Sequence, residues 1–346
     1  MAEKTVVHLA CYKDIVSDIN VKLQNINVHN VTTYDVDERI LKTPKSIGFY
    51  RQPNPDEYPI DLAKGYQDMI FSISDPDHYL KQKTLHYIMS QNQRPKFDIC
   101  TARGALKEIN YGRNTDFAAI HFKDCIYIKS IKNAVNPSPR ESYQYELRKN
   151  LFVDTPGDLP DVEQRLDQRK QIYANFSAHL GIFRILYSAE MSGVDNTEPL
   201  GDLNDPDVLK QLRFTMAKVR QMKNGPDYTR EKNIEPEWLF QAHFVGIKQL
   251  RLAHFNEKAL VTQPIETIQI SDLYKKHESK LNKRLQLLHS LLCKIKNLMA
   301  DDDCPYTTYV FRVRNNRISY ERHVGQNKYC FLDEEYIQFV NEQYKD

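Results

Sequence analysis

The stretch Ile185-Leu186-Tyr187-Ser188-Ala189-Glu190-Met191-Ser192 is an apolar run that ends in polar side chains. Its apolar first half predicts a buried β-strand, and the acidic loop from Ser192 to Asp207 follows it. Side chains alternate between the two faces of a strand, so Glu190 and Ser192 point to the same side. A carboxylate at a strand end, next to a polar loop, is well placed to meet a metal ion. The stretch therefore predicts a sheet and a place where chemistry could occur.

On both sides of this stretch, strands and helices interleave without a regular repeat. Strands are predicted at 97–102, 117–129, 247–255, 258–268, 309–313 and 318–322. Helices are predicted at 60–89, 158–180, 238–245, 271–298 and 333–343, while 208–216 is ambiguous. The mixture predicts one α+β domain with mixed sheets at 44–346, preceded by an N-terminal arm or opening strand at 1–43.

The composition limits the classes of partner. The 346 residues carry a net charge of +2, so RNA binding would require a local groove because there is no general basic field. Six scattered cysteines without CxxC spacing and eleven histidines without an HExxH motif do not predict a zinc site. No apolar run approaches the ~18 residues that a membrane span needs, and no signal peptide is expected.

Five segments carry a more specific pattern. They are Arg103-Gly104-Ala105-Leu106-Lys107, Tyr143-Gln144-Tyr145-Glu146, Leu186-Tyr187-Ser188-Ala189-Glu190-Met191-Ser192, Gln211-Leu212-Arg213-Phe214-Thr215 and Trp238-Leu239-Phe240-Gln241-Ala242-His243-Phe244-Val245-Gly246. In this order they resemble the RG-x-L-T-K, G-Y-x-F-E, L-Y-G-x-E-x-D, E-L-K-T-S and W-x-x-Q-S-F-L-x-G segments of the DXO family of RNA decapping enzymes and 5′–3′ exoribonucleases. The resemblance implies two mixed β-sheets with flanking helices and a central active-site pocket that holds two metal ions.

The departures from the family pattern fall on its charged positions. Glu146 and Glu190 keep the acidic character, but Ser192 stands where the resemblance implies Asp, Gln211 where it implies Glu, and Arg213 where it implies Lys. The formal charge of these five positions changes from −3 in the family to −1 here. We therefore expect no catalytic residues, and we interpret Glu146 and Glu190 as vestigial metal ligands. Arg cannot readily lose a proton, so Arg213 could not replace a Lys in proton transfer.

Asp195 is the candidate for rescuing the site. It lies five residues after Glu190, so on a continued strand it would face the other way, although Gly193 could bend the chain.

Three side chains are candidates for RNA contact: Arg103, Arg213 and Gln241. Each has a simpler alternative. Arg103 could form a loop salt bridge, Arg213 could neutralise Glu146 or Glu190, and Gln241 could cap its own helix. Trp238 is more typical of a core residue than of a base-stacking platform.

The hypothesis that follows is a non-catalytic family member that binds or shields RNA 5′ ends, or scaffolds a nuclear RNA-processing complex, with no cofactor. The resemblance is strongest to a degenerate insect germline branch, which implies nuclear localisation, the piRNA pathway and the Rhino–Deadlock chromatin complex as partner. One alternative is an active Mg²⁺- or Mn²⁺-dependent enzyme that uses Glu146, Glu190 and Asp195. The other alternative is a protein-interaction scaffold without RNA binding.

Overall fold

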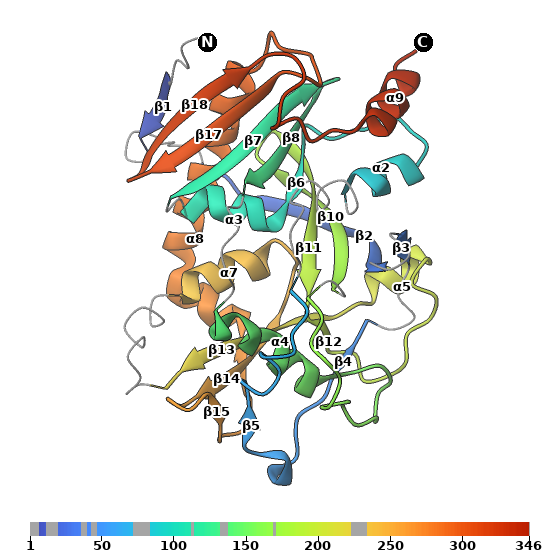
Figure 1. The fold of residues 1–346 in the computed structure, drawn as a ribbon, viewed down its shortest axis with the longest axis vertical. Coiled ribbons are helices and arrows are strands. Elements are labelled where there is room, and N and C mark those ends of the chain that lie inside the picture. The colour runs from blue at the N-terminus through green and yellow to red at the C-terminus, as the bar shows by residue number, and fades with distance from the viewer. Residues whose placement is uncertain are drawn as a thin grey trace.

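The computed structural model describes residues 7–11, 20–35, 40–42, 47–71, 84–111, 114–131, 138–168, 171–222 and 234–345. These residues form two mixed β-sheets with helices packed on and between them (Figure 1), which confirms the predicted fold class. None of the described helices is long and apolar enough to span a lipid bilayer.

The larger sheet occupies the upper half of Figure 1. Its described strands follow the order β1-β18-β17-β7-β8-β6-β11-β10-β2-β3. They are β1 (Val7–Cys11), β2 (Leu23–Asp35), β3 (Ile40–Lys42), β6 (Ile99–Ala102), β7 (Thr115–Phe122), β8 (Cys125–Ile131), β10 (Ile172–Leu180), β11 (Phe183–Met191), β17 (Thr308–Arg314) and β18 (Arg317–His323). Strand β6 runs parallel to both of its neighbours, β8 and β11, and the other pairs are antiparallel.

The smaller sheet lies in the lower half of the same view. Its order is β5-β15-β14-β13-β12-β4-β9, and β16 pairs with β14. Its described strands are β4 (Phe49–Tyr50), β5 (Ile60–Asp61), β9 (Phe152–Val153), β12 (Gly193–Val194), β13 (Phe214–Gln221), β14 (Gln249–Phe255), β15 (Leu260–Val261) and β16 (Glu266–Gln269).

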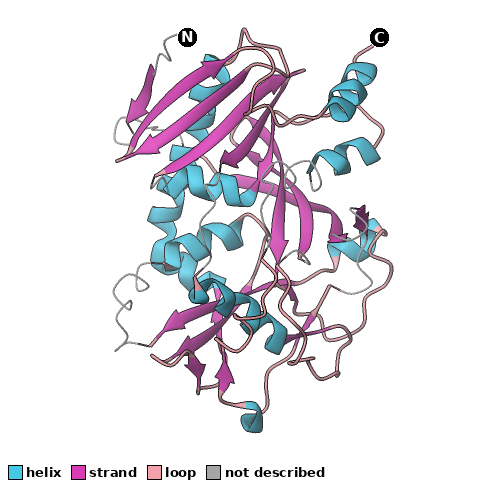
Figure 2. Cartoon of the chain, in the orientation of Figure 1, coloured by secondary structure: helices cyan, strands magenta, loops and turns pink. Residues whose placement is uncertain are grey.

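Helices flank the two sheets, as the cyan segments of Figure 2 show. The described helices are the 3₁₀ turn η1 (Pro55–Glu57), α2 (His86–Ser90), α3 (Arg103–Tyr111), α4 (Pro139–Leu151), α5 (Pro206–Lys210), α7 (Glu235–His243), α8 (Ile270–Leu298) and α9 (Glu334–Gln343). Helix α8 packs against α3 and α7. The helix predicted at 271–298 is confirmed by α8, and one face of it is buried from Leu281 to Ile295.

The chain passes from the larger sheet to the smaller one immediately after Glu190. Strand β11 ends at Met191 and β12 begins at Gly193. A side chain at 193 would not fit, because an added Cβ would lie 2.5 Å from the carbonyl oxygen of Gly48. Glu190 and Ser192, at the polar end of the stretch 185–192, therefore lie where the chain passes between the two sheets.

An aromatic core fixes α7 against β11. The ring centroids of Tyr187 and Phe244 are 5.5 Å apart, and those of Phe240 and Phe244 are 4.8 Å apart. All three rings are fully buried, and the Tyr187 hydroxyl donates a hydrogen bond to the carbonyl oxygen of Phe244. Because aromatic packing of this kind is rigid, the position of α7 relative to the end of β11 is set by the core.

The helix predicted at 158–180 is wrong, because the described residues 158–168 form turns and irregular chain rather than a helix. Residues 172–180 form β10, which pairs with β2 on one side and β11 on the other. The strand is buried almost throughout, so its apolar residues do not alternate, and a short buried strand is hard to distinguish from a helix by periodicity. The predicted helix at 60–89 is found only as α2, and residues 72–83 lie outside the described residues.

The N-terminal segment contributes β1, β2 and β3 to the larger sheet. Strand β2 pairs with β10 from Leu23, opposite Leu180, to Thr33, opposite Ile172. That residues 44–346 form a single domain stays a prediction.

Candidate functional site

Glu190, at the end of β11, is ion-paired with a cation that the sequence motifs did not indicate. Arg148 Nη1, from α4, donates to Glu190 Oε1. The side chains are partly open to solvent, with exposed fractions of 21% for Arg148 and 30% for Glu190. The negative charge that resemblance to a nuclease would assign to a metal is therefore matched by a guanidinium.

Arg103 joins this pair to α7. It is the first residue of α3, and it is buried. Its Nη2 donates to the carbonyl oxygen of Glu190 at 3.0 Å, and its Nη1 donates to the carbonyl oxygen of Gln241 at 3.4 Å. Burial lowers the pKa of Arg103 to about 10, although the Glu190 carboxylate acts in the opposite direction. The bonds that hold Arg103 thus go to neutral carbonyl groups.

Lys218, on β13, reaches the same place from the smaller sheet. Its Nζ donates to Gln241 Oε1 at 3.0 Å, and Gln241 Nε2 donates to Glu237 Oε1 at 3.3 Å. Lys107 Nζ lies 3.0 Å from Glu237 Oε1 and completes the network. Burial, together with the positive charges of Arg103, Arg148 and Lys107, lowers the pKa of Lys218 to about 7, although the Glu190 carboxylate acts in the opposite direction.

These contacts form one connected group, which we call the Glu190 cluster. It consists of Arg103, Lys107, Arg148, Glu190, Lys218, Glu237 and Gln241. Four cations face two carboxylates, so with Lys218 protonated the cluster has a formal excess of two positive charges. Helix α3 begins at Arg103, and its N-terminus adds partial positive charge.

The Glu190 cluster does not fit the two divalent ions that the sequence resemblance implies. Ser192 is 9% exposed, and its Oγ accepts a hydrogen bond from the backbone N–H of Ala217 at 3.2 Å. Among the described residues, no three His, Cys, Asp or Glu side chains gather in a way that could hold a metal ion. Two divalent cations would add four charges to a cluster that is already positive, and such charge needs several anionic ligands.

Glu146 is separated from Glu190. It lies on α4 two residues before Arg148, and residues two apart on an α-helix point about 200° away from each other. Its Oε1 accepts from Lys149 Nζ at 2.8 Å and from Asn150 Nδ2 at 3.3 Å, and the residue is 1% exposed. The structure therefore does not bring together the two glutamates interpreted as vestigial metal ligands.

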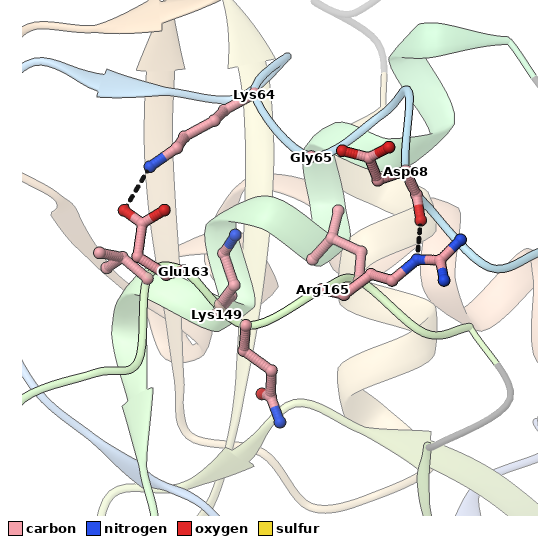
Figure 3. A pocket seen from close by; sticks show the side chains of 9 residues that line it. Lys64, Gly65, Asp68, Lys149, Glu163 and Arg165 are labelled. Atoms are coloured by element: carbon pink, nitrogen blue, oxygen red, sulfur yellow. Dashed lines mark hydrogen bonds and ion pairs between the residues drawn. The ribbon is translucent and has the colours of Figure 1, made fainter.

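A surface pocket of about 410 Å³ is lined in part by Gly65, which packs against Glu146, and by Lys149 (Figure 3). An ion pair between Lys64 and Glu163 lies on one side of it, and Arg165 donates to the backbone carbonyl of Asp68 on the other. Lys149, the partner of Glu146, lines the space between them. Two of the cations that line this pocket, Lys64 and Lys149, pair with carboxylates, whereas Arg165 donates to a carbonyl oxygen.

Asp195 has its own cation. Its Oδ1 pairs with Arg251 Nη2, and the Arg251 guanidinium stacks over the Tyr50 ring at 4.0 Å from the centroid. The structure thus places the carboxylate proposed for rescue in a separate ion pair on the smaller sheet.

The segment 208–216, which the sequence left ambiguous between helix and strand, contains the end of a short helix and the start of a strand. Gln211 is the C-cap of the short helix α5, and β13 begins only at Phe214. Both side chains are exposed. The cation of this segment that reaches the neighbours of Glu190 is Lys218, and Met216, two residues before it, is buried and apolar. If the Glu-x-Lys part of the family pattern is aligned with residues 216–218, Lys218 keeps the lysine and Met216 stands in place of the glutamate.

The other candidates are distributed as follows. Arg103 and Gln241 both lie in the Glu190 cluster, and Gln241 contacts Lys218 through its side chain. Trp238 is 3% exposed, and Arg220 stacks over it at 4.7 Å, so it is a core residue. Whether any of these side chains contacts RNA stays a prediction.

Sequence reasoning missed Arg148, Lys107, Lys218 and Glu237. The signal for Lys218 was present, because it lies in a stretch of strand-forming residues and alternation places it on the face of Met216. Arg148 and Tyr145 are three apart on α4, on one helix face, and the Arg148 guanidinium lies 5.6 Å from the Tyr145 ring centroid. Which strand end that face meets could not be deduced from the helix alone.

Comparison with known proteins places this fold in the PD-(D/E)XK class of nucleases. Residues 29–337 match the family model described as RAI1 like PD-(D/E)XK nuclease, so the chain belongs to this family. The family assignment predicted from the five segments is confirmed.

The relatives include a protein from Drosophila melanogaster, Protein cutoff. It is 27% identical over 294 residues, which cover 78% of this chain and 74% of that protein. Among solved structures, Candida albicans Rai1 in complex with pU5-Mn²⁺ has a TM-score of 0.77 at 13% identity, covering 98% of this chain and 99% of that one. K. lactis Dxo1 in complex with manganese has a TM-score of 0.61 at 14% identity, covering 93% of this chain and 98% of that one. At these identities, the structures support the fold alone.

Proposed function

We propose that this protein is a non-catalytic member of the family that binds RNA 5′ ends and shields them from decay. The observation that carries the proposal is the ion pair between Glu190 and Arg148. A guanidinium there competes with metal for the carboxylate, and the surrounding cations favour an anion instead. Of the cluster's two carboxylates, only Glu190 lies on β11, the strand that ends in the sequence stretch 185–192, so no metal-dependent step is assigned.

The proposal extends to the setting in which the protein works. The 27% sequence identity to Protein cutoff supports the proposal that this protein acts in the nucleus, in the piRNA pathway, as part of an RNA-processing complex. The Rhino–Deadlock chromatin complex is the candidate partner, and co-purification of the two recombinant components with this chain tests the assignment. Failure of both to co-purify, while RNA binding persists, would remove the partner and leave the RNA-end function.

The test of the function uses the full chain and a 3′-labelled, 5′-monophosphorylated RNA. We expect salt-sensitive binding, no shortening of the RNA in Mg²⁺ or Mn²⁺, and slower digestion by an added 5′–3′ exonuclease when the protein saturates the RNA. Binding that does not vary with salt, or no binding, would favour a protein-interaction scaffold.

The same RNA also tests the active-enzyme alternative. Shortened RNA, or released cap from a capped substrate, would contradict the proposal if Glu190→Gln abolishes the activity. Glu334→Gln, on α9, is the matched control because Glu334 contacts Tyr306, which is not part of the Glu190 cluster.

A further inference from the structure

Two cations of the Glu190 cluster, Arg103 and Lys218, bind acceptors without net charge. Arg103 uses two of its donors on backbone carbonyls, and Lys218 donates to the amide oxygen of Gln241. Carbonyl and amide oxygens are dipoles without net charge, so these bonds orient the cations but do not neutralise them. Only Arg148 and Lys107 have carboxylate partners within the cluster.

The cluster is accessible to a ligand from solvent. Four of its side chains have exposed fractions between 21% and 31%: Arg148, Glu190, Lys107 and Glu237. Arg103 and Lys218 lie deeper, tied to the same elements. A ligand can therefore approach over the half-exposed rim and meet the cations that have no carboxylate of their own.

The size of the charge excess selects the chemical class of ligand. A terminal phosphate monoester carries about −1.5 to −2 charges near pH 7, whereas each internal phosphodiester carries one. The cluster's formal excess is two when Lys218 is protonated, and a bound phosphate favours that protonated form. Guanidinium and ammonium donors with the N-terminus of α3 are groups that bind phosphate well.

We propose that the Glu190 cluster binds the terminal phosphate of an RNA 5′ end directly through Lys218 and Arg103, without a divalent metal ion. The inference rests on the proposed function, because it specifies how the same site holds its ligand. The cations of this chain occupy the electrostatic role that metal ions have in a nuclease of this fold. Binding is selective for a 5′-monophosphate over a 5′-hydroxyl.

The experiment measures the affinity of the full chain for two RNAs of one sequence, one with a 5′-monophosphate and one with a 5′-hydroxyl, in buffer with EDTA. We expect the monophosphorylated RNA to bind roughly tenfold more tightly. Lys218→Met keeps the length and apolar stem of the side chain, and it should remove the preference for the 5′-monophosphate. Lys275→Met is the matched control, because Lys275 is exposed on α8 and pairs with Asp272.

Gln241→Glu is a second variant, in case Lys218→Met does not fold. It is nearly isosteric, and its added carboxylate would neutralise Lys218, so the preference should again be lost. Equal affinity for the two RNAs in EDTA, a preference that appears only with Mn²⁺, or an unchanged preference in both variants would each overturn the inference.

Inorganic phosphate separates this inference from the proposed function. It should raise the thermal midpoint of the wild-type protein in EDTA but not that of Lys218→Met. If phosphate does so and neither RNA binds, the phosphate site stands and the RNA-end function fails. If RNA binds and is protected without any preference for its 5′ group, the site assignment fails while RNA shielding stands.

Discussion

Two groups of charged side chains each include a glutamate of α7, and they differ in what their cations contact. In the first, Glu235 accepts from Arg220 Nη2 at 3.1 Å, Lys276 Nζ at 2.6 Å and His277 Nε2 at 2.9 Å. We call this the Glu235 cluster. In the second, the Glu190 cluster, Arg103 and Lys218 bind carbonyl and amide oxygens instead.

The difference separates a structural group from a binding group. Every cation of the Glu235 cluster converges on one carboxylate, which ties β13, α7 and α8 together. The Glu190 cluster is connected equally well, but its positive charge is only partly matched. Hydrogen bonds hold both clusters in place, and only charge matching decides whether a group can still attract an ion.

The largest expected effect is the loss of stability in Glu235→Gln. Arg220 has an exposed fraction of only 14%, so it would remain nearly buried without a counter-charge. We expect the free energy of unfolding to fall by about 3 kcal/mol, measured by urea denaturation. Asp272→Asn, which breaks an exposed pair on α8, should cost less than about 0.5 kcal/mol. Equal losses in the two variants would show that Glu235 does not have the proposed structural role.

The next effect tests the charge excess directly. Ser192→Asp combined with Met216→Glu places two carboxylates on strand faces beside Glu190 and Lys218. The excess should fall to zero, and the affinity for 5′-monophosphorylated RNA in EDTA should drop by roughly a hundredfold, or ~2.7 kcal/mol.

Calorimetry with Mn²⁺ accompanies this double variant. It should bind the metal, whereas the wild type should not. Ile182→Asp combined with Val324→Glu adds the same charge at exposed sites, where the residues are 74% and 66% exposed, and should change the RNA affinity little. Tight Mn²⁺ binding by the wild type would contradict the charge argument.

A smaller effect is expected for Glu190→Gln. The Arg148 pair is partly exposed, so the loss of unfolding free energy should be about 1 kcal/mol, less than for Glu235→Gln. The cluster's excess rises to three, and RNA affinity should increase several-fold. Weaker RNA binding in this variant would show that Glu190 positions the cations rather than opposing the ligand.

The smallest effect concerns acid stability. Desolvation alone would raise the pKa of Glu235, but hydrogen bonds from His277, Lys276 and Arg220 outweigh it and lower the pKa to about 2. A carboxyl with a lowered pKa in the folded state stabilises the protein above its unfolded pKa of about 4.5, and this contribution is lost as the pH falls toward 2. The thermal midpoint of the wild type should therefore fall more steeply below pH 4.5 than that of Glu235→Gln. Parallel curves would argue against the assignment.

Local patterns predicted those elements in which the side-chain period matches the burial pattern. The stripe of α8, the helix around Trp238 and the hairpin of β17 and β18 are examples. Strand β10 lies between β2 and β11 in the sheet, and its side chains are buried on both faces. It was missed because alternating burial does not mark it as a strand. Its burial depends on partners far away in the sequence.

The candidate site was predicted only in part for a similar reason. Arg103 begins α3, Glu190 lies near the end of β11 and Gln241 lies near the end of α7. These three residues lie together in the structure. The family's lysine position was assigned to Arg213, whereas the cation that reaches the neighbours of Glu190 is Lys218. The assignment failed because the short helix α5 separates the acidic loop from β13. Counting charges at aligned positions also could not show that Arg148 supplies the counter-charge of Glu190.

The sequence alone determined the family, the two-sheet class of fold and the loss of acidic groups after Glu190, because these follow from residue types in a fixed order. Tertiary structure alone decided which charges meet. Successive helix positions differ by about 100°, so Glu146 and Arg148 of α4 have different partners. Strand register placed Lys218 beside Gln241. These are relations between elements distant in the chain, and they determine whether a set of charges holds the fold together or remains available to a phosphate.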